Sequence, residues 1–212
     1  IYFLSIHPLE AISSPAPGIH SKHQGCRLCG SSLLRCIIPL PPVPIGEHYS
    51  FTAASEDAER YPVDIYQCMS CSAVQTIDNI DPDFLWKDYT YFSGQTQKIL
   101  DHFADFVSEA RQISGNYNGT VLDIGSNDGS LLKEFKRYGY NVQGIDPAST
   151  VVDKANDDGI STHLGLFNNT STNLLAIEEG YSIITAFNVF AHSQQMSEMV
   201  NGVKSLLSKD GV

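Results

Sequence analysis

Four of the five cysteines in this 212-residue sequence are spaced as metal ligands would be. Cys26 and Cys29 form one CxxC pair, and Cys68 and Cys71 form a second pair further along the chain. Two such pairs can present four thiolates in the tetrahedral geometry that zinc prefers. Because four protein ligands leave no open position for a reacting water, the spacing predicts a structural zinc ion rather than a catalytic one. Cys36 falls outside the pattern.

Two other chemistries are compatible with paired cysteines. Two disulfides would fit a secreted, cysteine-dense small domain better than a chain with five cysteines in 212 residues. A thioredoxin-like redox motif would need only one pair. His23, which precedes Cys26 by three residues, is an alternative metal ligand.

A loop with two glycines follows a run of apolar residues in the sequence VLDIGSNDGS. The pattern predicts a strand that ends at Asp123, a loop with Gly125 and Gly129, and a helix that begins near Ser130. Dinucleotide-binding loops read GxGxxG, whereas here three residues separate the glycines and an acidic residue closes the strand. The spacing favours a cofactor without a pyrophosphate and with a positively charged end, namely S-adenosylmethionine. Binding of NAD and a plain fold element are the alternatives.

Asp146 is the candidate ligand for the ribose of that cofactor. It follows Gly144 and Ile145 at the end of the next predicted strand, where a carboxylate can accept hydrogen bonds from both ribose hydroxyls. An Asp before Pro147 can also simply start a helix. The loop and the acid together, in the order strand, loop, helix, strand, favour the cofactor site.

The elements that must position these residues change in character near Asp81. Before it lie the cysteines, the proline-rich segment PLPPVPIGEHY and short candidate strands such as YPVDIYQC. After it, helical patterns alternate with strand patterns. We therefore predict a poorly ordered lead-in over residues 1–24, a zinc-binding module over residues 25–85 and a cofactor-binding domain over residues 86–212.

The second domain has the pattern of an α/β fold. Its predicted strands are 120–124, 141–145, 162–164 and 181–190, and its predicted helices are 95–113, 130–139, 151–158 and 194–207. The first helix has an apolar face made of Ile99, Phe103, Phe106, Val107, Ala110 and Ile113. The last helix is expected to bury Met196, Met199, Val200, Val203 and Leu207. Such alternation builds a Rossmann-like parallel sheet with helices on both faces.

Seven segments, in order, resemble one known family, the zinc-containing C-methyltransferases that act on nucleotide-linked deoxyketosugars. The segments are CRLCG, LPPVPIGE, YPVDIYQCMSC, DYTYFSGQT, VLDIGSNDGSLL, GIDPA and FNVFAHS, and the match covers residues 26–212. The resemblance implies a zinc module followed by a class I methyltransferase domain. It also implies S-adenosylmethionine and Zn²⁺ as cofactors and a nucleotide sugar as the small-molecule partner.

The resemblance implies roles for particular residues as well. The four zinc thiolates map onto Cys26, Cys29, Cys68 and Cys71. The cofactor contacts map onto Asp123, Gly125, Asn127, Gly129 and Asp146, with further contacts from Ser93, Phe187 and Asn188. One of the tyrosines in the segment 89–93, Tyr89 or Tyr91, is implied to act in the active site, together with His192.

The chemistry that the resemblance suggests gives these residues a physical role. Methylation of a carbon beside a ketone first requires removal of a proton to make an enolate, so a base and a hydroxyl donor must flank the sugar. His192 is the candidate base, because the unperturbed pKa of histidine lies near neutrality. Tyr89 or Tyr91 is the candidate donor to the developing oxyanion. Aromatic packing before a helix and a hydrogen-bonded loop histidine are the structural alternatives.

The net charge of −11 is spread over both halves of the chain and argues against a nucleic-acid partner or an anionic membrane surface. No apolar run approaches the roughly 18 residues that a membrane-spanning helix needs. We therefore expect a soluble, cytoplasmic protein that is a monomer at full length.

Domains of the resembled type continue for three more strands, whereas this sequence ends at Val212, where a fifth strand should begin. We therefore expect a fragment whose fourth strand is an unpaired edge, with poor solubility and little turnover. The acceptor pocket would then lie largely outside these residues. Two further hypotheses stay open: methylation of oxygen or nitrogen on another small molecule, and a zinc-ribbon scaffold without catalysis.

Overall fold

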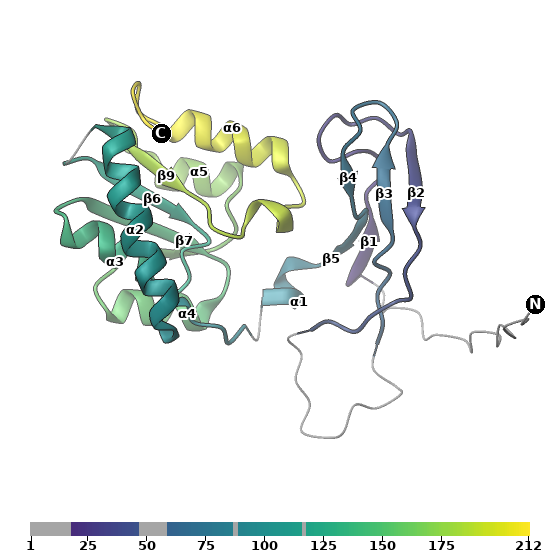
Figure 1. Ribbon diagram of the computed structural model, residues 1–212, viewed down its shortest axis with the longest axis horizontal. Coiled ribbons are helices and arrows are strands. Elements are labelled where there is room, and N and C mark those ends of the chain that lie inside the picture. Colours follow the sequence, from purple (N-terminus) through teal and green to yellow (C-terminus); the bar gives the residue numbers. More distant parts are fainter. Residues whose placement is uncertain (1–17, 47–58, 87–88, 116–117) are drawn as a thin grey trace, which may run out of the picture. The chain divides into compact units, whose positions relative to one another are not determined.

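The computed structural model describes residues 18–46, 59–86, 89–115 and 118–212 (Figure 1). The chain divides into two compact units, Ile1–Phe84 and Leu85–Val212. Across the described residues, no helix combines the length and the apolar character that crossing a membrane requires.

The N-terminal unit is built from short antiparallel strands. These are β1 (His20–Lys22), β2 (Leu34–Ile38), β3 (Ile65–Cys68), β4 (Val74–Gln75) and β5 (Asp78–Ile80), and α1 (Pro82–Trp86) follows them. Strands β2, β3 and β4 form one sheet, and β1 pairs with β5 in another. In the first sheet Leu34 lies opposite Cys68, so the pairing brings the two CxxC segments together.

The predicted lead-in is shorter than the sequence analysis placed it. Residues 20–22 form β1, because their backbone pairs with β5 from Ile80 back to Asp78. The prediction of poor order up to residue 24 is therefore wrong for these residues, and residues 1–17 lie outside the described part of the chain.

The C-terminal unit is a parallel α/β sheet. Its first half contains η1 (Ser93–Gln95), α2 (Gln97–Ser114), β6 (Thr120–Ile124), α3 (Ser130–Arg137), β7 (Asn141–Asp146) and α4 (Ser149–Asp157). Its second half contains β8 (Thr162–Leu164), α5 (Asn169–Leu175), β9 (Ile183–Thr185), η2 (Phe190–His192) and α6 (Met196–Leu206). The strand order is β8-β7-β6-β9. Every pair is parallel, as the sequence pattern predicted.

Helices cover both faces of this sheet, because side chains along each strand point alternately to opposite faces (Figure 1). Val121 of β6 joins a core formed with α2, α3 and α4. Its neighbour Leu122 joins a second core with Leu175 of α5 and Met199 of α6. The sheet is therefore buried on both sides, which explains why Val121, Leu122 and Ile124 of β6 are all apolar.

The two outer helices differ from the prediction. In α2, Ile113 is 66% exposed, because it lies in the last turn beyond the apolar contacts of Phe103, Val107 and Ala110. In α6, the buried residues are Met199, Gly202 and Leu206, whereas Val200 is half exposed. Gly202 determines which face of α6 packs against the domain, because the helix approaches its neighbours closely there. A Cβ at this position would lie 2.9 Å from atoms of Phe167 and Thr172.

That close approach involves α5, which the sequence analysis did not predict. The sequence of α5 is too polar for an apolar periodicity to indicate a helix. Asn168 and Ser171 nevertheless form a capping box at its start, which is a local signal for a helix N-terminus. At the far edge of the sheet, Val212 donates a backbone hydrogen bond to Ser182 and accepts one from Ile184. Part of the edge of β9 that was expected to be unpaired is thus occupied.

Candidate metal centre and cofactor site

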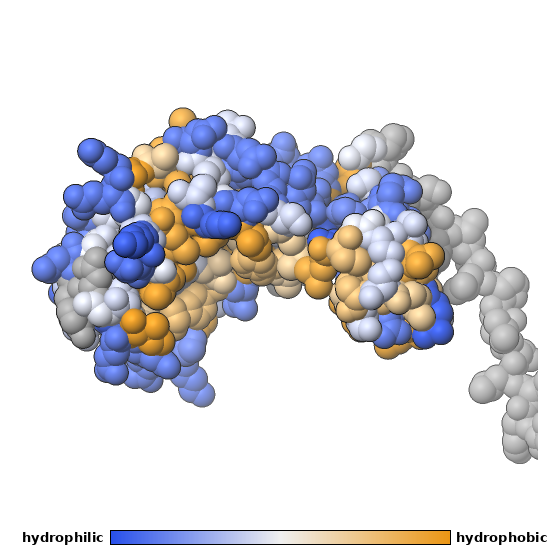
Figure 2. All heavy atoms as spheres, turned by 90° about the horizontal axis from the view of Figure 1, so that it is seen from above, coloured by the Kyte–Doolittle hydropathy of each residue, from blue (hydrophilic) through white to orange (hydrophobic). Residues whose placement is uncertain are grey.

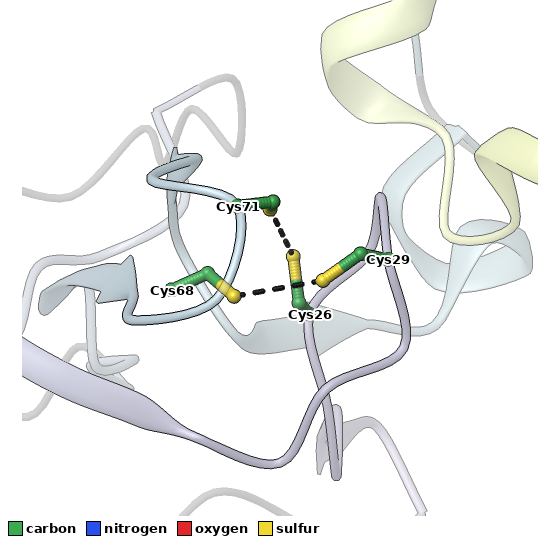
Figure 3. Close-up of side chains that lie close together, drawn as sticks. All are labelled: Cys26, Cys29, Cys68 and Cys71. Carbon is green, nitrogen blue, oxygen red and sulfur yellow. Dashed lines mark hydrogen bonds between the residues drawn. The ribbon is translucent and has the colours of Figure 1, made fainter.

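The four predicted zinc ligands converge in the N-terminal unit (Figure 3). The sulfur atoms of Cys26 and Cys71 lie 3.6 Å apart, as do those of Cys29 and Cys68, and all four lie within 4.8 Å of one another. A disulfide would require about 2.05 Å, and none of the five cysteines forms one. A tetrahedron with Zn–S distances of about 2.3 Å has edges of about 3.8 Å. The sulfur cluster therefore fits a tetrahedral metal ion, and the disulfide alternative is wrong.

The two CxxC segments share one turn geometry. Gly30 and Ser72, each directly after the second cysteine of its pair, have φ angles of 74° and 64°. The Gly30 amide donates to the Cys26 carbonyl at 2.8 Å, and the Ser72 amide donates to the Cys68 carbonyl at 2.9 Å. The small residue that follows each pair is therefore needed for a left-handed turn that wraps the backbone around the sulfurs.

Hydrogen bonds, burial and neighbouring thiols shift the pKa values of the cysteine side chains. The Gln75 side chain donates to the Cys26 sulfur at 3.0 Å, while its oxygen accepts the Arg27 amide at 2.8 Å. Burial raises the pKa of Cys26, but the Cys29 backbone and Gln75 outweigh it and lower that pKa to about 6. The Ala73 amide lowers the pKa of Cys71, yet the neighbouring thiols and burial raise it to about 12. Ionisation of all four sulfurs at this spacing would therefore require a cation that balances their charge.

The alternative ligand His23 and the fifth cysteine, Cys36, lie outside the cluster. Among the described residues, the group that could hold a metal comprises the four cysteines and does not include His23. Cys36 is exposed on β2.

The glycine loop of the C-terminal unit lies between the ends of β6 and β7. Gly125 and Gly129 have φ angles of 71° and 72°, and Asn127 has a φ angle of 51°. A Cβ on Gly125 would lie 2.3 Å from Val189, and one on Gly129 would lie 2.9 Å from Ile160. Both glycines are therefore required by backbone conformation and by close contact, as the sequence pattern predicted.

The two predicted acidic residues are buried at adjacent strand ends. Asp123 is 3% exposed and accepts the Thr185 hydroxyl at 2.7 Å. Asp146 is 6% exposed and accepts the backbone amides of Asn127 and Ala148, both at 2.9 Å. Open α/β sheets bind ligands beyond the carboxyl ends of their strands, where these groups lie.

Their pKa values follow from their surroundings. Burial raises the pKa of Asp123 to about 7, the Thr185 hydroxyl opposes this rise, and the charge of Asp146 adds to it. Burial also raises the pKa of Asp146, while the amides of Ala148 and Asn127 lower it. Asp123 is thus a carboxyl group that a positively charged ligand could ionise near neutral pH.

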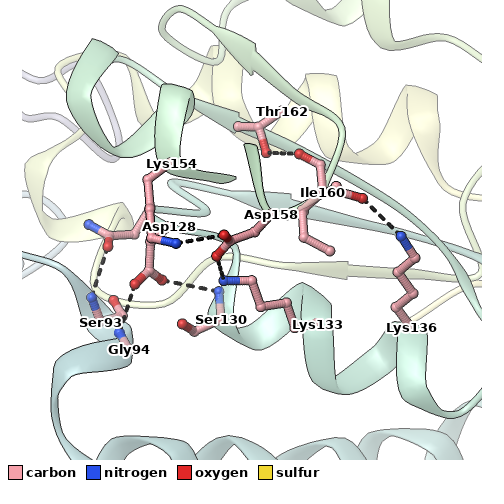
Figure 4. Close-up of polar contacts among 12 residues, drawn as sticks. Ser93, Gly94, Asp128, Ser130, Lys133, Lys136, Lys154, Asp158, Ile160 and Thr162 are labelled. Atoms are coloured by element: carbon pink, nitrogen blue, oxygen red, sulfur yellow. Dashed lines mark hydrogen bonds and ion pairs between the residues drawn. The ribbon is translucent and has the colours of Figure 1, made fainter. Parts of the chain in front are cut away.

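Residues 89–94, here called the tyrosine strap, are attached to this loop. Asn127 accepts the Ser93 amide at 2.9 Å and donates to the Tyr91 carbonyl at 3.0 Å. Asp128 accepts the Gly94 amide at 2.9 Å (Figure 4). At the start of the strap, the Thr150 hydroxyl donates to the Tyr89 carbonyl at 2.8 Å. The strap is therefore held by the loop that follows β6 and by the first turn of α4.

Two of the three candidate catalytic side chains pack against Trp86, and the third packs against one of these two. The ring of Trp86 lies edge-to-face against His192, with centroids 6.0 Å apart, and against Tyr89, with centroids 5.3 Å apart. Tyr89 in turn contacts Tyr91 with centroids 6.5 Å apart. His192 is exposed at the end of η2. The structure thus brings together His192 and the strap tyrosines, which are about a hundred positions apart in the sequence.

Family models match both parts of the chain. Residues 26–86 match the family described as "Putative zinc binding domain", and residues 93–212 match the family described as "Methyltransferase domain". The second match covers more than half of the chain. The chain belongs to the methyltransferase domain family.

Individual relatives of this methyltransferase-family chain are distant. The C-methyltransferase NovU of Streptomyces niveus is 28% identical over 190 residues, which are 88% of this chain and 45% of NovU. A ubiquinone biosynthesis O-methyltransferase of Rhodopseudomonas palustris (strain TIE-1) is 27% identical over 108 residues, 50% of this chain and 43% of that protein. The chain therefore spans less than half the length of these relatives. The crystal structure of Streptomyces venezuelae DesVI aligns with a TM-score of 0.43 and 13% identity, over 56% of this chain and 50% of that one.

Two predicted cofactor contacts lie after β9 in the methyltransferase domain. The ring of Phe187 packs edge-to-face on Phe106 and Phe103 of α2, at centroid distances of 4.7 and 5.7 Å. Asn188 is exposed and has a φ angle of 55°. The ring of Phe187 thus packs in the core of the domain. Contacts of Phe187 and Asn188 with the cofactor stay predictions.

Sequence reasoning missed several residues that complete the methyltransferase and metal sites. They are Gln75, Trp86, Asp128, Thr150 and Thr185. Trp86 is the single tryptophan of the chain and directly precedes the tyrosine segment, which is a signal that could have been used. Asp128 lies inside the glycine loop itself. Gln75, Thr150 and Thr185 act through tertiary contacts that no local pattern indicates.

Proposed function

We propose that the protein transfers the methyl group of S-adenosylmethionine to a carbon of a nucleotide-linked deoxyketosugar. The observation that carries this proposal is that His192 and Tyr89 both pack against Trp86, with Tyr91 against Tyr89, in the unit that contains the cofactor loop. A base and hydroxyl donors in one place are what enolate formation requires. Membership of the methyltransferase domain family supports the cofactor.

The cofactor role rests on the groups at the strand ends. In the proposal, Asp146 accepts hydrogen bonds from the ribose, and Asp123 faces the positively charged amino-acid end of the cofactor. Each oxygen of Asp146 accepts one backbone amide and has a lone pair left for a hydroxyl. Gly125 and Gly129 let the backbone approach the cofactor closely.

The acceptor chemistry assigns a separate role to each catalytic candidate. His192 removes the proton from the carbon beside the ketone, and a strap tyrosine donates a hydrogen bond to the enolate oxygen. The enolate carbon then attacks the cofactor methyl group, and S-adenosylhomocysteine leaves. Because His192 is exposed, it is accessible to a sugar that binds from solvent.

Methylation on carbon is favoured because the similarity to the C-methyltransferase NovU spans 88% of the chain. The nucleotide sugar as acceptor rests on the motif resemblance given in the sequence analysis. Methylation on oxygen is the second candidate, and the O-methyltransferase relative supports it over half of the chain. We further propose that the four cysteines hold a structural zinc ion and that the protein acts in the cytoplasm as a monomer.

Calorimetry tests the cofactor half of the proposal. We expect the chain to bind S-adenosylmethionine, and Asp146→Asn to weaken binding at least about tenfold, since a hydrogen bond to a charged group contributes about 1.5–3 kcal/mol. Asp153→Asn, which changes an exposed carboxylate on α4, is the matched control and should bind like the wild type. Absence of binding to the folded chain would reject the methyltransferase assignment.

Isotope exchange tests the acceptor half. With a nucleotide-linked deoxyketosugar deuterated beside its ketone, we expect the protein to release the deuterium to water. His192→Gln should slow this release at least about a hundredfold, the usual contribution of a general base. His163→Gln changes an exposed histidine on β8 and should leave it unchanged. Methylated product with the label retained and a methyl group on oxygen would favour the O-methyltransferase alternative.

A further inference from the structure

Asn127 makes more connections than a cofactor contact needs. Its side-chain oxygen accepts the Ser93 amide and its side-chain nitrogen donates to the Tyr91 carbonyl. Its backbone amide donates to Asp146. One residue therefore joins the carboxylate proposed to hold the ribose to the strap that carries the candidate catalytic tyrosines.

The chemistry of this connection is specific to asparagine. The side-chain amide pairs with the backbone on both sides of Phe92, as a neighbouring strand would. A carboxylate lacks the donor for the Tyr91 carbonyl, and a hydroxyl cannot make both bonds with a separate donor and acceptor in the same geometry. The φ angle of 51° also favours asparagine among residues with side chains.

The strap lies close against the loop at its other end too. A Cβ on Gly94 would lie 2.6 Å from the Ser130 hydroxyl and 2.8 Å from the Asp128 carboxylate. Gly94 also donates its amide to Asp128, which accepts the Ser130 amide with its other oxygen (Figure 4). Three backbone groups of the strap are thus held by side chains of two adjacent loop residues.

We propose that Asn127 is a positioning residue that holds the tyrosine strap on the cofactor loop and couples the strap to Asp146. The role of the strap in methyl transfer rests on the proposed function, but the attachment itself does not. Binding of the cofactor at Asp146 should steady the loop and, through Asn127, the strap. Because coupling between two sites is reciprocal, loosening the strap should weaken cofactor binding.

Two substitutions separate this role from general stability. Asn127→Gly removes the side chain but tolerates the left-handed backbone conformation. The control is Asn156→Ala, because Asn156 makes the same two-bond pairing with the backbone of Thr162, between α4 and β8. Both variants lose two side-chain hydrogen bonds to backbone, but only the first loses them at the strap.

The readouts need no turnover. Amide hydrogen exchange at Ser93 reports the bond to Asn127, and the fluorescence of Trp86, the single tryptophan, reports its contacts with Tyr89 and His192. We expect Asn127→Gly to speed exchange at Ser93 at least roughly tenfold, as loss of two net hydrogen bonds allows, and to shift Trp86 emission to the red. Asn156→Ala should do neither.

Equal exchange at Ser93 in wild type and Asn127→Gly, or equal effects of the two variants on the strap, would overturn the proposal. If Asn127→Gly does not fold, hydrogen exchange in the wild type still tests the attachment. The Asn127 side-chain amide should exchange slowly there, because it donates to the Tyr91 carbonyl. An exchange rate there equal to that of a free amide would also overturn it.

Cofactor titration distinguishes the two proposals. We expect S-adenosylmethionine to slow exchange at Ser93 in the wild type, and Asn127→Gly to weaken its binding several-fold. If the wild type does not bind the cofactor, the proposed function fails, while the exchange measurements without cofactor still judge the attachment. If the cofactor binds but leaves exchange at Ser93 unchanged, the coupling to Asp146 is wrong.

Discussion

Asp123 and Asp146 are buried to a similar degree, but different hydrogen bonds stabilise their carboxylates. Asp146 accepts two backbone amides, whereas the hydrogen bond found for Asp123 comes from the single hydroxyl of Thr185. The pKa of Asp123 is accordingly raised to about 7, mainly by burial. In the native state this residue binds a proton in mildly acidic solution, where an unfolded Asp would be ionised.

Cofactor affinity should therefore depend on pH through Asp123. The positively charged end of S-adenosylmethionine favours the ionised carboxyl group, so binding below pH about 7 must release a proton. We expect the affinity to rise from about pH 6 to about pH 8, by at most about tenfold per pH unit. Asp123→Asn should bind more weakly and show a flatter dependence. Calorimetry across this range measures both.

The control for this prediction is Asp158→Asn. Lys133 and Lys154 lower the pKa of Asp158 to about 2 (Figure 4), so it stays ionised throughout the range and its removal should leave the pH dependence intact. The sign for folding is opposite to that for binding. Because the native pKa of Asp123 lies above its unfolded value, the free energy of unfolding should fall as pH rises from about 4 to about 7. A pH-independent affinity would contradict the assignment of Asp123.

Residues were predictable where covalent spacing alone determines the geometry. The cysteine pairs and the loop glycines, such as Gly125, could be identified because their function depends on intervals of a few residues. Trp86 and Asn127 differ, because their partners His192 and Tyr91 come from distant segments. Asn127 was predicted to contact the cofactor, which stays a prediction, and its hydrogen bonds to the strap follow only from the tertiary structure.

At the scale of elements, the glycine loop can lie over β7 because Gly144 has no side chain. A Cβ there would lie 2.3 Å from the Ser126 hydroxyl and 2.9 Å from the Thr162 hydroxyl. We expect Gly144→Ala to lower the free energy of unfolding by about 1–3 kcal/mol, the usual cost of overpacking, and to weaken cofactor binding by displacing the loop. Chemical denaturation and calorimetry measure the two effects.

Gly46→Ala is the matched control, since a Cβ there would meet no atom within 4 Å. It should leave both quantities close to those of the wild type. Full stability in Gly144→Ala would mean that the loop does not depend on this contact.

The places of the strands along the chain were predictable because burial on both faces leaves segments rich in apolar residues, such as 120–124. The predicted strand 181–190 is shorter in the structure, where β9 spans Ile183–Thr185. The buried face of α6 could not be predicted from the sequence. Its register depends on Gly202, which packs against the segment around α5, and α5 has too few apolar residues to be recognised by periodicity. A helix face cannot be predicted reliably when the neighbour that covers it is missing from the prediction.

At the scale of the whole molecule, the two units differ in how they are stabilised. The C-terminal unit has two apolar cores, one on each face of its sheet. The described residues of the N-terminal unit include few large buried side chains, and Leu28, Leu33, Met69 and Val74 are each more than half exposed. Figure 2 shows hydrophobic atoms on the surface of this unit. A small unit with so little buried apolar surface is expected to depend on a metal for much of its stability.

Metal removal should therefore unfold the N-terminal unit selectively. A chelator would take away the ion that balances the charge of four thiolates, so we expect loss of hydrogen-exchange protection in β2 and β3 while β6 and β7 keep theirs. Binding of a structural zinc ion contributes folding free energy directly, and the replacement of Cys68 or Cys71 by Ser should have the same effect as the chelator. Elemental analysis should give one zinc per wild-type chain.

Cys36→Ser is the control, because Cys36 is exposed on β2 and lies outside the sulfur cluster. It should retain the metal and the protection of both sheets. If chelation left β2 and β3 protected, the short strands would be stable without metal, and the structural role of the zinc site would be wrong. If chelation instead unfolded both units together, their stabilities would be coupled, and the apolar cores of the C-terminal unit would be insufficient on their own.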